Sequence, residues 1–393
     1  MADTTQQQGS LAGPAGELIS ELRFVATGLG FARLGVAQVG RPPHHDAFQR
    51  WLTSGLAGAM HEWLARHEPL RGDPASLLED AKSVIMLATD HATGAGSPSP
   101  PEPGQGRVAR YAWGDDYHDL LRSRSNELGR WLEQRVPGCR TRGVVDSAPL
   151  AERDFAWLAG LGWFGKNTML IHPGAGSFFF LTALLTDLDL PADEPIQVDH
   201  CGTCTACLDA CPTGALVEPR VLDARACIST LTIEDRGSVP VELRTGMGAW
   251  VFGCDICQEV CPWNRHAPVS DEPAFAPRGG ATTLSLAEML LLDDAGFRER
   301  FQGSPILRAK RSGLARSAAI ALGNHPDPAA AAALETALRD PDPVVREAAT
   351  WALERWIEKG VQPQWARERL QAHAHSTVSS TSAEGSRPGA STA

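Results

Sequence analysis

The sequence predicts a multidomain protein of mixed α+β or α/β class, with several parts following one another along 393 residues. Three observations predict it. Apolar, β-rich runs alternate with a helical pattern in the N-terminal half, eight of the nine cysteines fall between Cys201 and Cys261, and the C-terminal part is helical and rich in alanine. The expected parts are a flexible N-terminus (1–16), an α/β domain (17–195), a cysteine-rich domain (196–275), a helical domain (276–372) and a disordered tail (373–393).

The N-terminal domain is predicted from two kinds of pattern. The apolar runs Ser83–Leu87 and Phe178–Leu184 are typical of buried strands. Between them, Tyr117–Arg135 carries apolar side chains at helical spacing. The stretch Gly94–Gly106 is rich in glycine, proline and serine and indicates a surface loop.

Composition and charge bound the function. The chain has no long uninterrupted apolar stretch, and its polar start does not resemble a secretory signal, so we expect a cytosolic protein that uses no membrane. The net charge of −11 argues against a protein that is basic throughout. The stretch from Arg298 to Arg316 is nevertheless basic and contains one acid, Glu299. It is either a local basic surface or a solvated helix face, and charge alone does not decide between them.

The cysteines indicate metal binding rather than disulfides, because their number is odd and no export signal precedes them. The first run has the spacing C-x2-C-x2-C-x3-C-P, which bacterial ferredoxins use for [4Fe–4S] clusters. The second run lacks the leading cysteine, and Cys227 can fill that gap. In such a pair, the last cysteine of each run serves the other cluster. The expected sets are Cys201, Cys204, Cys207 and Cys261 for one cluster, and Cys211, Cys227, Cys254 and Cys257 for the other.

Zinc is the alternative for these cysteines, since paired C-x2-C motifs also bind structural zinc. The x2-x2-x3 spacing and the two Cys-Pro steps favour iron–sulfur, so a ferredoxin-like domain with two [4Fe–4S] clusters is the prediction. Cys139 stands apart and is expected to be a partly buried thiol without a role. Because clusters move electrons without specifying a reaction, the chemistry must come from the residues upstream.

The C-terminal domain is predicted to be a short α-solenoid. Its helical segments, Ser312–Leu322, Ala329–Leu338 and Val344–Ile357, are separated by Asp-Pro turns. Helix, turn and helix in this order resembles a HEAT repeat. So short an array needs a neighbouring domain to pack on.

Several segments together resemble the epoxyqueuosine reductase family, over about residues 17–357. Two-cluster cysteines occur also in many ferredoxins and in reductive dehalogenases, but their combination with the motifs around Tyr117 and Asp146 is more specific. The motifs that carry the resemblance are Arg71-Gly72-Asp73-Pro74, Arg110-Tyr111-Ala112-Trp113-Gly114, Asp116-Tyr117-His118, Val145-Asp146-Ser147-Ala148-Pro149, Gly160-Leu161-Gly162-Trp163-Phe164-Gly165-Lys166-Asn167-Thr168 and Gly303-Ser304-Pro305-Ile306.

The resemblance implies cobalamin-dependent reduction of epoxyqueuosine to queuosine at the wobble position of tRNA, the last step of queuosine biosynthesis. It implies a cobalamin between the α/β domain and the cluster domain, with one cluster reducing cobalt and low-valent cobalt acting at the epoxide. The implied partners are an external electron donor and tRNAs with GUN anticodons, those for aspartate, asparagine, histidine and tyrosine. We expect the protein to act as a monomer.

Asp146 is the candidate proton donor. Opening an epoxide leaves an alkoxide, so a positioned acid helps the step. Partial burial beside Val144 and Val145 would raise the pKa of Asp146 and keep it protonated near neutral pH. Local sequence alone favours another interpretation, in which Asp146 caps a helix that begins near Pro149. The resemblance reverses that preference, because Asp146 matches the family's proton donor.

The resemblance also implies cobalamin contacts for a wider set of positions. Arg71 suits a corrin amide or a phosphate, whereas Leu170 and Leu181 also suit ordinary core packing. His118 stands in an Asp-x-His-x-x-Leu sequence, without the glycine of known cobalt-binding histidine motifs, so we expect a supporting residue rather than a cobalt ligand. Lys166 and Asn167 follow a glycine-rich turn that is no dinucleotide fingerprint. The full set of expected contacts is Arg71, Ala109, Asp146, Leu170, Leu181, Ser229 and Asp255.

The basic stretch gains a meaning from the expected substrate. Arg308, Lys310, Arg311 and Arg316 could contact the phosphates of the anticodon stem, with the wobble base flipped out. Three alternatives stay open: an iron–sulfur electron carrier, a corrinoid reductive dehalogenase and a zinc-stabilised RNA-binding protein. The dehalogenase is disfavoured by the missing export signal and by the solenoid end.

Overall fold

The computed structural model describes residues 14–94, 101–280 and 282–383. The chain forms two compact units, each built from separate chain segments. The cysteine-rich region contributes to both, which corrects the expectation of three consecutive domains. Unit 1 comprises Met1–Ser97, Arg110–Cys227 and Asp255–Pro277, and unit 2 comprises Pro98–Ala109, Ile228–Cys254 and Arg278–Ala393.

Unit 1 is built around a four-stranded sheet in the order β1-β2-β7-β4. The central strands, β2 (Ser83–Asp90) and β7 (Phe179–Thr186), contain the two predicted apolar runs and are buried over almost their whole length. The outer strands are β1 (Arg33–Gln38) and β4 (Thr141–Val144). All neighbouring strands are antiparallel, so this unit is α+β, which corrects the expectation of an α/β domain over residues 17–195.

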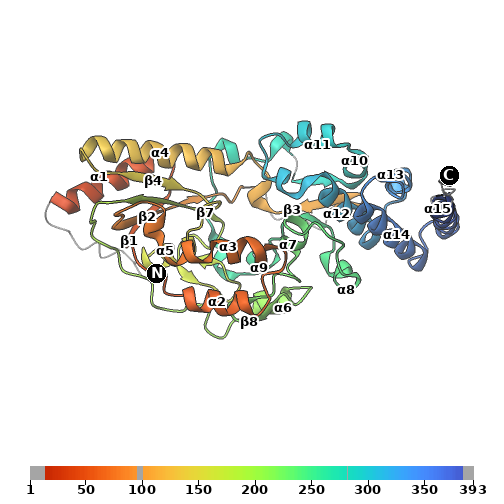
Figure 1. The fold of residues 1–393 in the computed structure, drawn as a ribbon, viewed down its shortest axis with the longest axis horizontal. Helices are drawn as coiled ribbons and strands as arrows, with labels where there is room; N and C mark the ends of the chain where they lie inside the picture. The colour runs from red at the N-terminus through yellow and green to blue at the C-terminus, as the bar shows by residue number, and fades with distance from the viewer. Residues whose placement is uncertain (1–13, 95–100, 281, 384–393) are drawn as a thin grey trace, which may run out of the picture. The chain divides into compact units, whose positions relative to one another are not determined.

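Helices cover both faces of this sheet (Figure 1). Strand side chains alternate between the faces, so Ile85 and Leu87 face one layer while Val84 and Met86 face the other. The first layer holds α1 (Pro14–Gly28) and α4 (Tyr117–Arg135), and the second holds α5 (Glu152–Leu158).

Helix α4 has the bounds that its spacing predicted. Asp116 caps it by accepting a hydrogen bond from the backbone N–H of His118, at 3.1 Å. Leu121, Leu128 and Leu132 are fully buried along its inner face. This packing fixes Tyr117 and His118 at the beginning of the helix.

The rest of unit 1 consists of short elements. The helices of the cysteine region, α6 (Ala206–Ala210) and α9 (Ile256–Glu259), contain no buried residue. A region with so little apolar core needs another source of stability, as ligand bonds would supply. The remaining elements are α2 (His45–Thr53), α3 (His61–Gly72), β5 (Trp163–Phe164), β6 (Leu170–Ile171), β8 (Leu216–Glu218) and β9 (Val221–Leu222).

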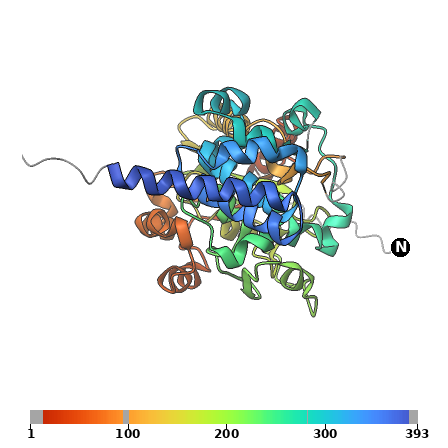
Figure 2. The same ribbon diagram turned by 90° about the vertical axis from the view of Figure 1, so that its right-hand side faces the viewer.

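Unit 2 joins a three-stranded sheet, in the order β10-β3-β11, to a helical array. The three predicted helices are confirmed as α12, α13 and α14. In Figure 2, α15 crosses in front of the other helices of the array. The elements are β3 (Gln105–Val108), α7 (Ile228–Ile233), α8 (Val241–Arg244), β10 (Trp250–Phe252), β11 (Thr283–Ser285), α10 (Leu286–Leu291), α11 (Asp294–Phe301), α12 (Lys310–Asn324), α13 (Ala331–Ala337), α14 (Pro343–Glu358) and α15 (Pro363–Ala383).

The ends and the predicted loop differ in part from expectation. Helix α15 continues to Ala383, so residues 373–383 are helical rather than part of a disordered tail. Residues 384–393 and most of the predicted N-terminal segment lie outside the described residues, as do residues 95–100 of the predicted loop. Among the helices that are described, none is both long and apolar enough to cross a membrane.

Candidate active site

Asp146 lies on a short loop between β4 and α5. Its backbone is left-handed, with φ of 49°, and Ser147 donates a backbone hydrogen bond to the carbonyl of Val145 at 2.5 Å. Aspartate tolerates this conformation better than most residues. Helix α5 begins at Glu152 with Ala151 as its N-cap and has no side-chain cap, so the alternative that Asp146 caps this helix is wrong.

Three groups hold Asp146 in place. The hydroxyl of Tyr117 donates to Oδ2 of Asp146 at 2.8 Å, and Nε2 of His118 lies 3.2 Å from the same oxygen. The backbone N–H of Asp146 donates to Oε1 of Glu152 at 2.7 Å. The side chain of Asp146 is nevertheless 60% exposed. Asp146 is therefore a carboxyl group that is fixed by the protein and accessible from solvent.

The environment does not raise the pKa of Asp146 as expected. Desolvation raises this pKa, but hydrogen bonds from His118 and Tyr117 outweigh it and hold the pKa below its ordinary value. Burial raises the pKa of the Tyr117 hydroxyl, which therefore stays protonated and donates. Asp146 is thus a carboxylate at neutral pH in this structure, which corrects the expectation that it holds a proton there.

His118 is the first of two groups that hold protons beside Asp146. Desolvation lowers the pKa of His118, but hydrogen bonds to Asp116, at 2.7 Å from Nδ1, and to Asp146 raise it to about 9. At neutral pH the ring is therefore an imidazolium between two carboxylates. This placement agrees with the expectation that His118 supports the site.

Glu152 is the second group that holds a proton beside Asp146, and the sequence analysis did not identify it. Desolvation and then the charge of Asp146 raise the pKa of Glu152 to about 8, so this carboxyl group is neutral at pH 7. Arg71 and Arg153 lower the same pKa by a smaller amount. A glutamate in the first turn of a helix is ordinary in sequence, and only its position against the Asp146 loop distinguishes it.

Arg71 lies in the last turn of α3 beside this site. One guanidinium nitrogen donates to the carbonyl of Leu150 at 3.2 Å, and the group lies over the rings of Phe48 and Trp63. Within the described residues, the buried Nε of Arg71 has no hydrogen-bond partner. A buried donor without a partner is costly, and an acceptor on a bound cofactor would satisfy it.

The other expected cofactor contacts lie in varied surroundings. Ala109 and Leu170 are buried, and Leu181 packs against the core that contains Leu170. Ser229 lies in α7 of unit 2. Asp255, which precedes α9, is buried and accepts a hydrogen bond from the backbone N–H of Arg110 at 2.7 Å.

None of the nine cysteines, all of which the structure describes, forms a disulfide. Cys204 is exposed, and the other eight are partly buried. Burial raises the pKa values of Cys207, Cys257 and Cys261, and the charges of neighbouring thiols raise them further. Cys201 and Cys204 act on Cys261, whereas Cys227, Cys207 and Cys211 act on Cys257, in decreasing order of strength. Cys261 therefore lies near thiols of its own expected set, whereas Cys257 lies near thiols of both sets.

Across residues 14–94, 101–280 and 282–383, no group of three or more His, Cys, Asp or Glu side chains is arranged to hold one metal ion. Cys139 is partly buried against the first core layer, as expected.

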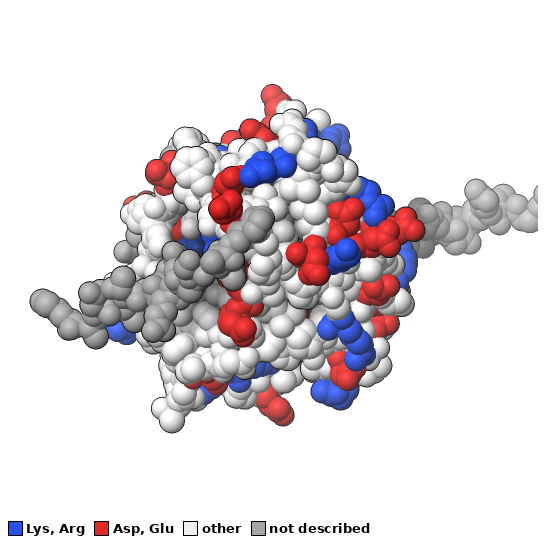
Figure 3. Space-filling view, turned by 90° about the vertical axis from the view of Figure 1, so that its left-hand side faces the viewer, with Lys and Arg blue, Asp and Glu red and all other residues white. Residues whose placement is uncertain are grey.

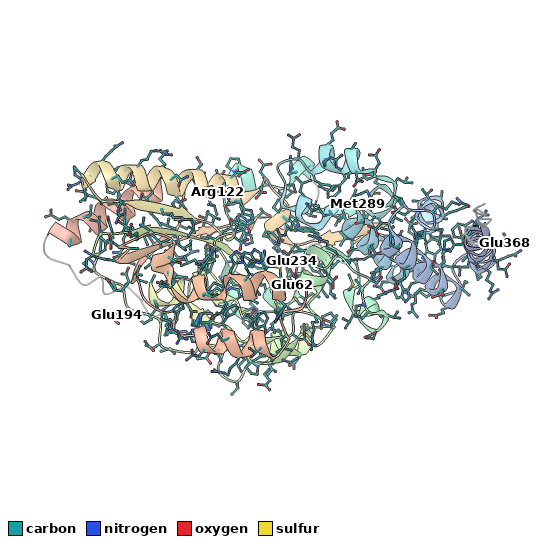
Figure 4. All side chains as sticks on the ribbon, in the orientation of Figure 1. Glu62, Arg122, Glu194, Glu234, Met289 and Glu368 are labelled. Atoms are coloured by element: carbon teal, nitrogen blue, oxygen red, sulfur yellow. The ribbon has the colours of Figure 1, made fainter. Side chains whose placement is uncertain are left out.

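The four basic residues proposed for tRNA contact divide into two pairs. Arg311 is buried and forms a two-pronged ion pair with Asp340, at 2.7 and 2.8 Å. Arg316 is also buried and donates to backbone carbonyls, including that of Asp235 at 3.1 Å. Arg308 and Lys310 are exposed, and Arg308 pairs at 2.9 Å with Glu234, which is labelled in Figure 4. Only the exposed pair is placed to meet a ligand from solvent.

Charge on the surface is mixed where it can be followed. On the face drawn in Figure 3, Lys and Arg side chains are interspersed with Asp and Glu. This distribution agrees with an acidic chain that carries no single large basic surface among the described residues of this face.

Three family models match the chain. Residues 200–264 match the 4Fe-4S double cluster binding domain, residues 71–147 match epoxyqueuosine reductase QueG, and residues 305–385 match HEAT repeats. A double-cluster binding domain in one chain with a loop that carries a fixed, accessible carboxyl group defines the class of a redox protein with its own reaction site.

The relatives identify the family. The chain is 43% identical over 332 residues to the epoxyqueuosine reductase of Pseudomonas aeruginosa, which covers 83% of this chain and 91% of that one. It is 40% identical over 346 residues to that of Escherichia coli, covering 87% and 90%. The chain belongs to the epoxyqueuosine reductase family.

Solved structures agree with this assignment. An epoxyqueuosine reductase bound to an epoxyqueuosine-modified tRNA-Tyr stem loop matches with a TM-score of 0.81 and 30% identity, over 91% of this chain and 99% of that one. The enzyme from Bacillus subtilis, solved with an aspartate-bearing catalytic loop swung out of the active site, gives the same values.

Proposed function

We propose that this chain reduces epoxyqueuosine to queuosine at the wobble position of tRNA, the last step of queuosine biosynthesis. The observation that carries the proposal is the match, over most of the chain, to enzymes named for this reaction, one of them solved with the modified tRNA stem loop. The reaction takes up two electrons and two protons, breaks both C–O bonds of the epoxide and releases its oxygen as water.

The proposed cofactors are two [4Fe–4S] clusters and a cobalamin. Cys201, Cys204, Cys207 and Cys261 would hold one cluster, and Cys211, Cys227, Cys254 and Cys257 the other. When bound, the clusters supply single electrons and the cobalamin supplies low-valent cobalt as the reductant of the epoxide. The unpartnered Nε of Arg71 and the accessible carboxyl group of Asp146 suit such a cofactor. Ala109, Leu170, Leu181, Ser229 and Asp255 stay expected contacts.

The protein's part in the chemistry is to hold and deliver protons. At neutral pH, His118 and Glu152 each carry one proton beside Asp146, because their pKa values are raised. Asp146 is the exposed member, and Nε2 of His118 is within hydrogen-bond distance of its Oδ2. We assign Asp146 as the group that receives a proton from this reserve and passes it to the opening epoxide.

The proposed partners are the tRNA substrate and an electron donor. The expected substrates are tRNAs with GUN anticodons, and an external donor would supply the electrons to a monomeric enzyme in the cytosol. Arg308 and Lys310 are the exposed basic residues that we propose to meet the anticodon-stem phosphates.

The test is an anaerobic incubation of the full chain with cobalamin, a reductant and tRNA that contains epoxyqueuosine, followed by nucleoside analysis. Queuosine should appear only when all components are present. A chain that takes up iron and sulfide but makes no queuosine with cobalamin would instead be an electron carrier. Zinc in place of iron in anaerobically purified protein would overturn both the reductase and the electron-carrier assignments.

A further inference from the structure

The turn between β5 and β6 has no role in the function described so far, although it carries Lys166 and Asn167. It is a closed turn: Gly165 donates to the carbonyl of Met169 at 2.8 Å, and Thr168 donates to the carbonyl of Gly165 at 3.0 Å. The side chain of Asn167 is buried, and its Oδ1 accepts the backbone N–H of Met169 at 3.2 Å. The backbone of Lys166 and Asn167 is therefore fixed by the hydrogen bonds of the turn.

Lys166 reaches into the first cysteine run. Its Nζ donates to the carbonyl of Gly202 at 2.7 Å and to that of Cys204 at 2.9 Å. Gly202 lies between Cys201 and Cys204, two of the thiols expected to hold one cluster. A lysine ammonium that bridges two carbonyls of one loop both fixes the loop and places a positive charge beside it.

Asn167 reaches the second cysteine run. Its Nδ2 donates to the carbonyl of Cys257 at 3.1 Å. Cys257 belongs to the other expected set. The contact has the same form as those of Lys166, a side-chain donor on a backbone carbonyl, but it brings no charge.

We propose that Lys166 and Asn167 are positioning residues for one cluster each, and that the charge of Lys166 selectively raises the reduction potential of the cluster held by Cys201, Cys204, Cys207 and Cys261. Reduction adds negative charge to a cluster, so a nearby cation stabilises the reduced form. The attraction falls with distance, so the loop that Lys166 binds is affected most. The proposal rests on the two-cluster part of the proposed function.

The experiment is a potentiometric titration of the reconstituted full chain, followed by electron paramagnetic resonance and accompanied by iron and sulfide analysis. The unmodified protein should show two cluster midpoints. Failure to find them would refute the two-cluster assignment itself, before Lys166 is considered.

Lys166→Met keeps most of the side-chain length and removes the charge and donors. It should shift one midpoint to a more negative value and leave the other unchanged. Lys166→Arg keeps the charge and should keep both midpoints near those of the unmodified protein. Asn167→Ala should leave the midpoint that responds to Lys166 where it is.

Where Lys166→Met keeps its full iron content, unchanged midpoints or equal shifts of both midpoints would overturn the proposal. If Lys166→Met loses iron, loss confined to one cluster and restored in Lys166→Arg supports the positioning role. Loss of both clusters in Lys166→Met refutes it.

Discussion

Asp146 combines two properties that rarely occur together in one side chain. It is fixed by Tyr117, His118 and Glu152, and its carboxylate remains mostly exposed. The three neighbouring groups have pKa values that are shifted in opposite directions: the pKa of Asp146 is lowered, whereas the pKa values of His118 and Glu152 are raised. Environments that separate the pKa values of adjacent groups are a mark of proton-transfer sites.

The first prediction concerns Asp146 itself. Asp146→Asn preserves size and can still accept hydrogen bonds, but it cannot pass a proton. We expect queuosine formation to slow by roughly 100-fold to 10,000-fold, the usual contribution of a general acid. Single-turnover nucleoside analysis gives the rate, and iron and sulfide analysis should show both clusters retained. Full activity in this variant would remove Asp146 from the mechanism.

The second prediction concerns the pH dependence of kcat/KM. Glu152 holds its proton below a pKa of about 8 and loses it above, so activity should fall as pH rises through 8 and again near the His118 pKa of about 9. In Glu152→Gln the side chain still accepts the Asp146 N–H but cannot release a proton. The variant should be slower at pH 7 and show only the fall near pH 9.

The matched control for Glu152 is Glu194→Gln, since Glu194 is exposed and its carboxyl group has no part in the site (Figure 4). Glu194→Gln should keep both falls in kcat/KM. If Glu152→Gln also keeps the fall at pH 8, the proton reserve assigned to Glu152 does not exist.

At the scale of elements, close helix packing in unit 2 depends on small residues. Helix α12 is buried along nearly its whole length and packs on α14. A methyl group on Gly323 would meet the indole ring of Trp351 and lie 3.1 Å from Cα of Ala352. Gly313, in the same helix, has its nearest neighbour at 3.7 Å, a guanidinium nitrogen of Arg236. Gly323 is therefore required by the close contact with α14, whereas the position of Gly313 has room for a methyl group.

The third prediction compares them. Gly323→Ala should destabilise unit 2 by about 1–3 kcal/mol, because the added methyl group over-packs the contact with α14. Gly313→Ala should leave stability unchanged or raise it by up to about 1 kcal/mol, through better helix propensity. Thermal denaturation of the full chain measures both. A lower melting temperature for Gly313→Ala than for Gly323→Ala would contradict this account of the packing.

At the scale of the whole molecule, the two units are interleaved along the chain. Unit 2 takes its strand β3 from residues 98–109, between two segments of unit 1, and its other parts from residues 228–254 and 278–393. A fragment cut at the predicted boundary of 275 would therefore separate β3 from its partner β11. Each unit needs chain segments that are distant in sequence, so the full chain is the proper object of experiment.

The fourth prediction concerns tRNA binding by a protein with a net charge of −11. Reversing both exposed basic residues, Arg308→Glu with Lys310→Glu, should weaken binding and reduce the slope of log K against log salt by about 1 for each lost phosphate contact. Binding measured over a salt series gives the slope. Arg122→Glu on α4, whose side chain is 48% exposed, is the control (Figure 4). Equal effects from the control would show a general charge effect.

The sequence by itself determined the features that are written in local spacing. Cysteine spacing predicted a double-cluster domain, which the family match over residues 200–264 confirms. The apolar period of Tyr117–Arg135 predicted α4 with its bounds, and the Asp-Pro turns predicted α12, α13 and α14. Local patterns suffice here because helix period, turn chemistry and ligand spacing each depend on residues close together in the chain.

Only the tertiary structure decided which residues share a site and which charges are available. In the folded chain, Glu152 and His118 lie against Asp146. The pKa of Asp146 is lowered there, although burial was expected to raise it. Arg311 and Arg316 are buried. The fold also brings Lys166 to the carbonyls of the cysteine loop. These outcomes depend on burial and on hydrogen bonds between residues far apart in the chain, and a pKa is set by all of those neighbours together.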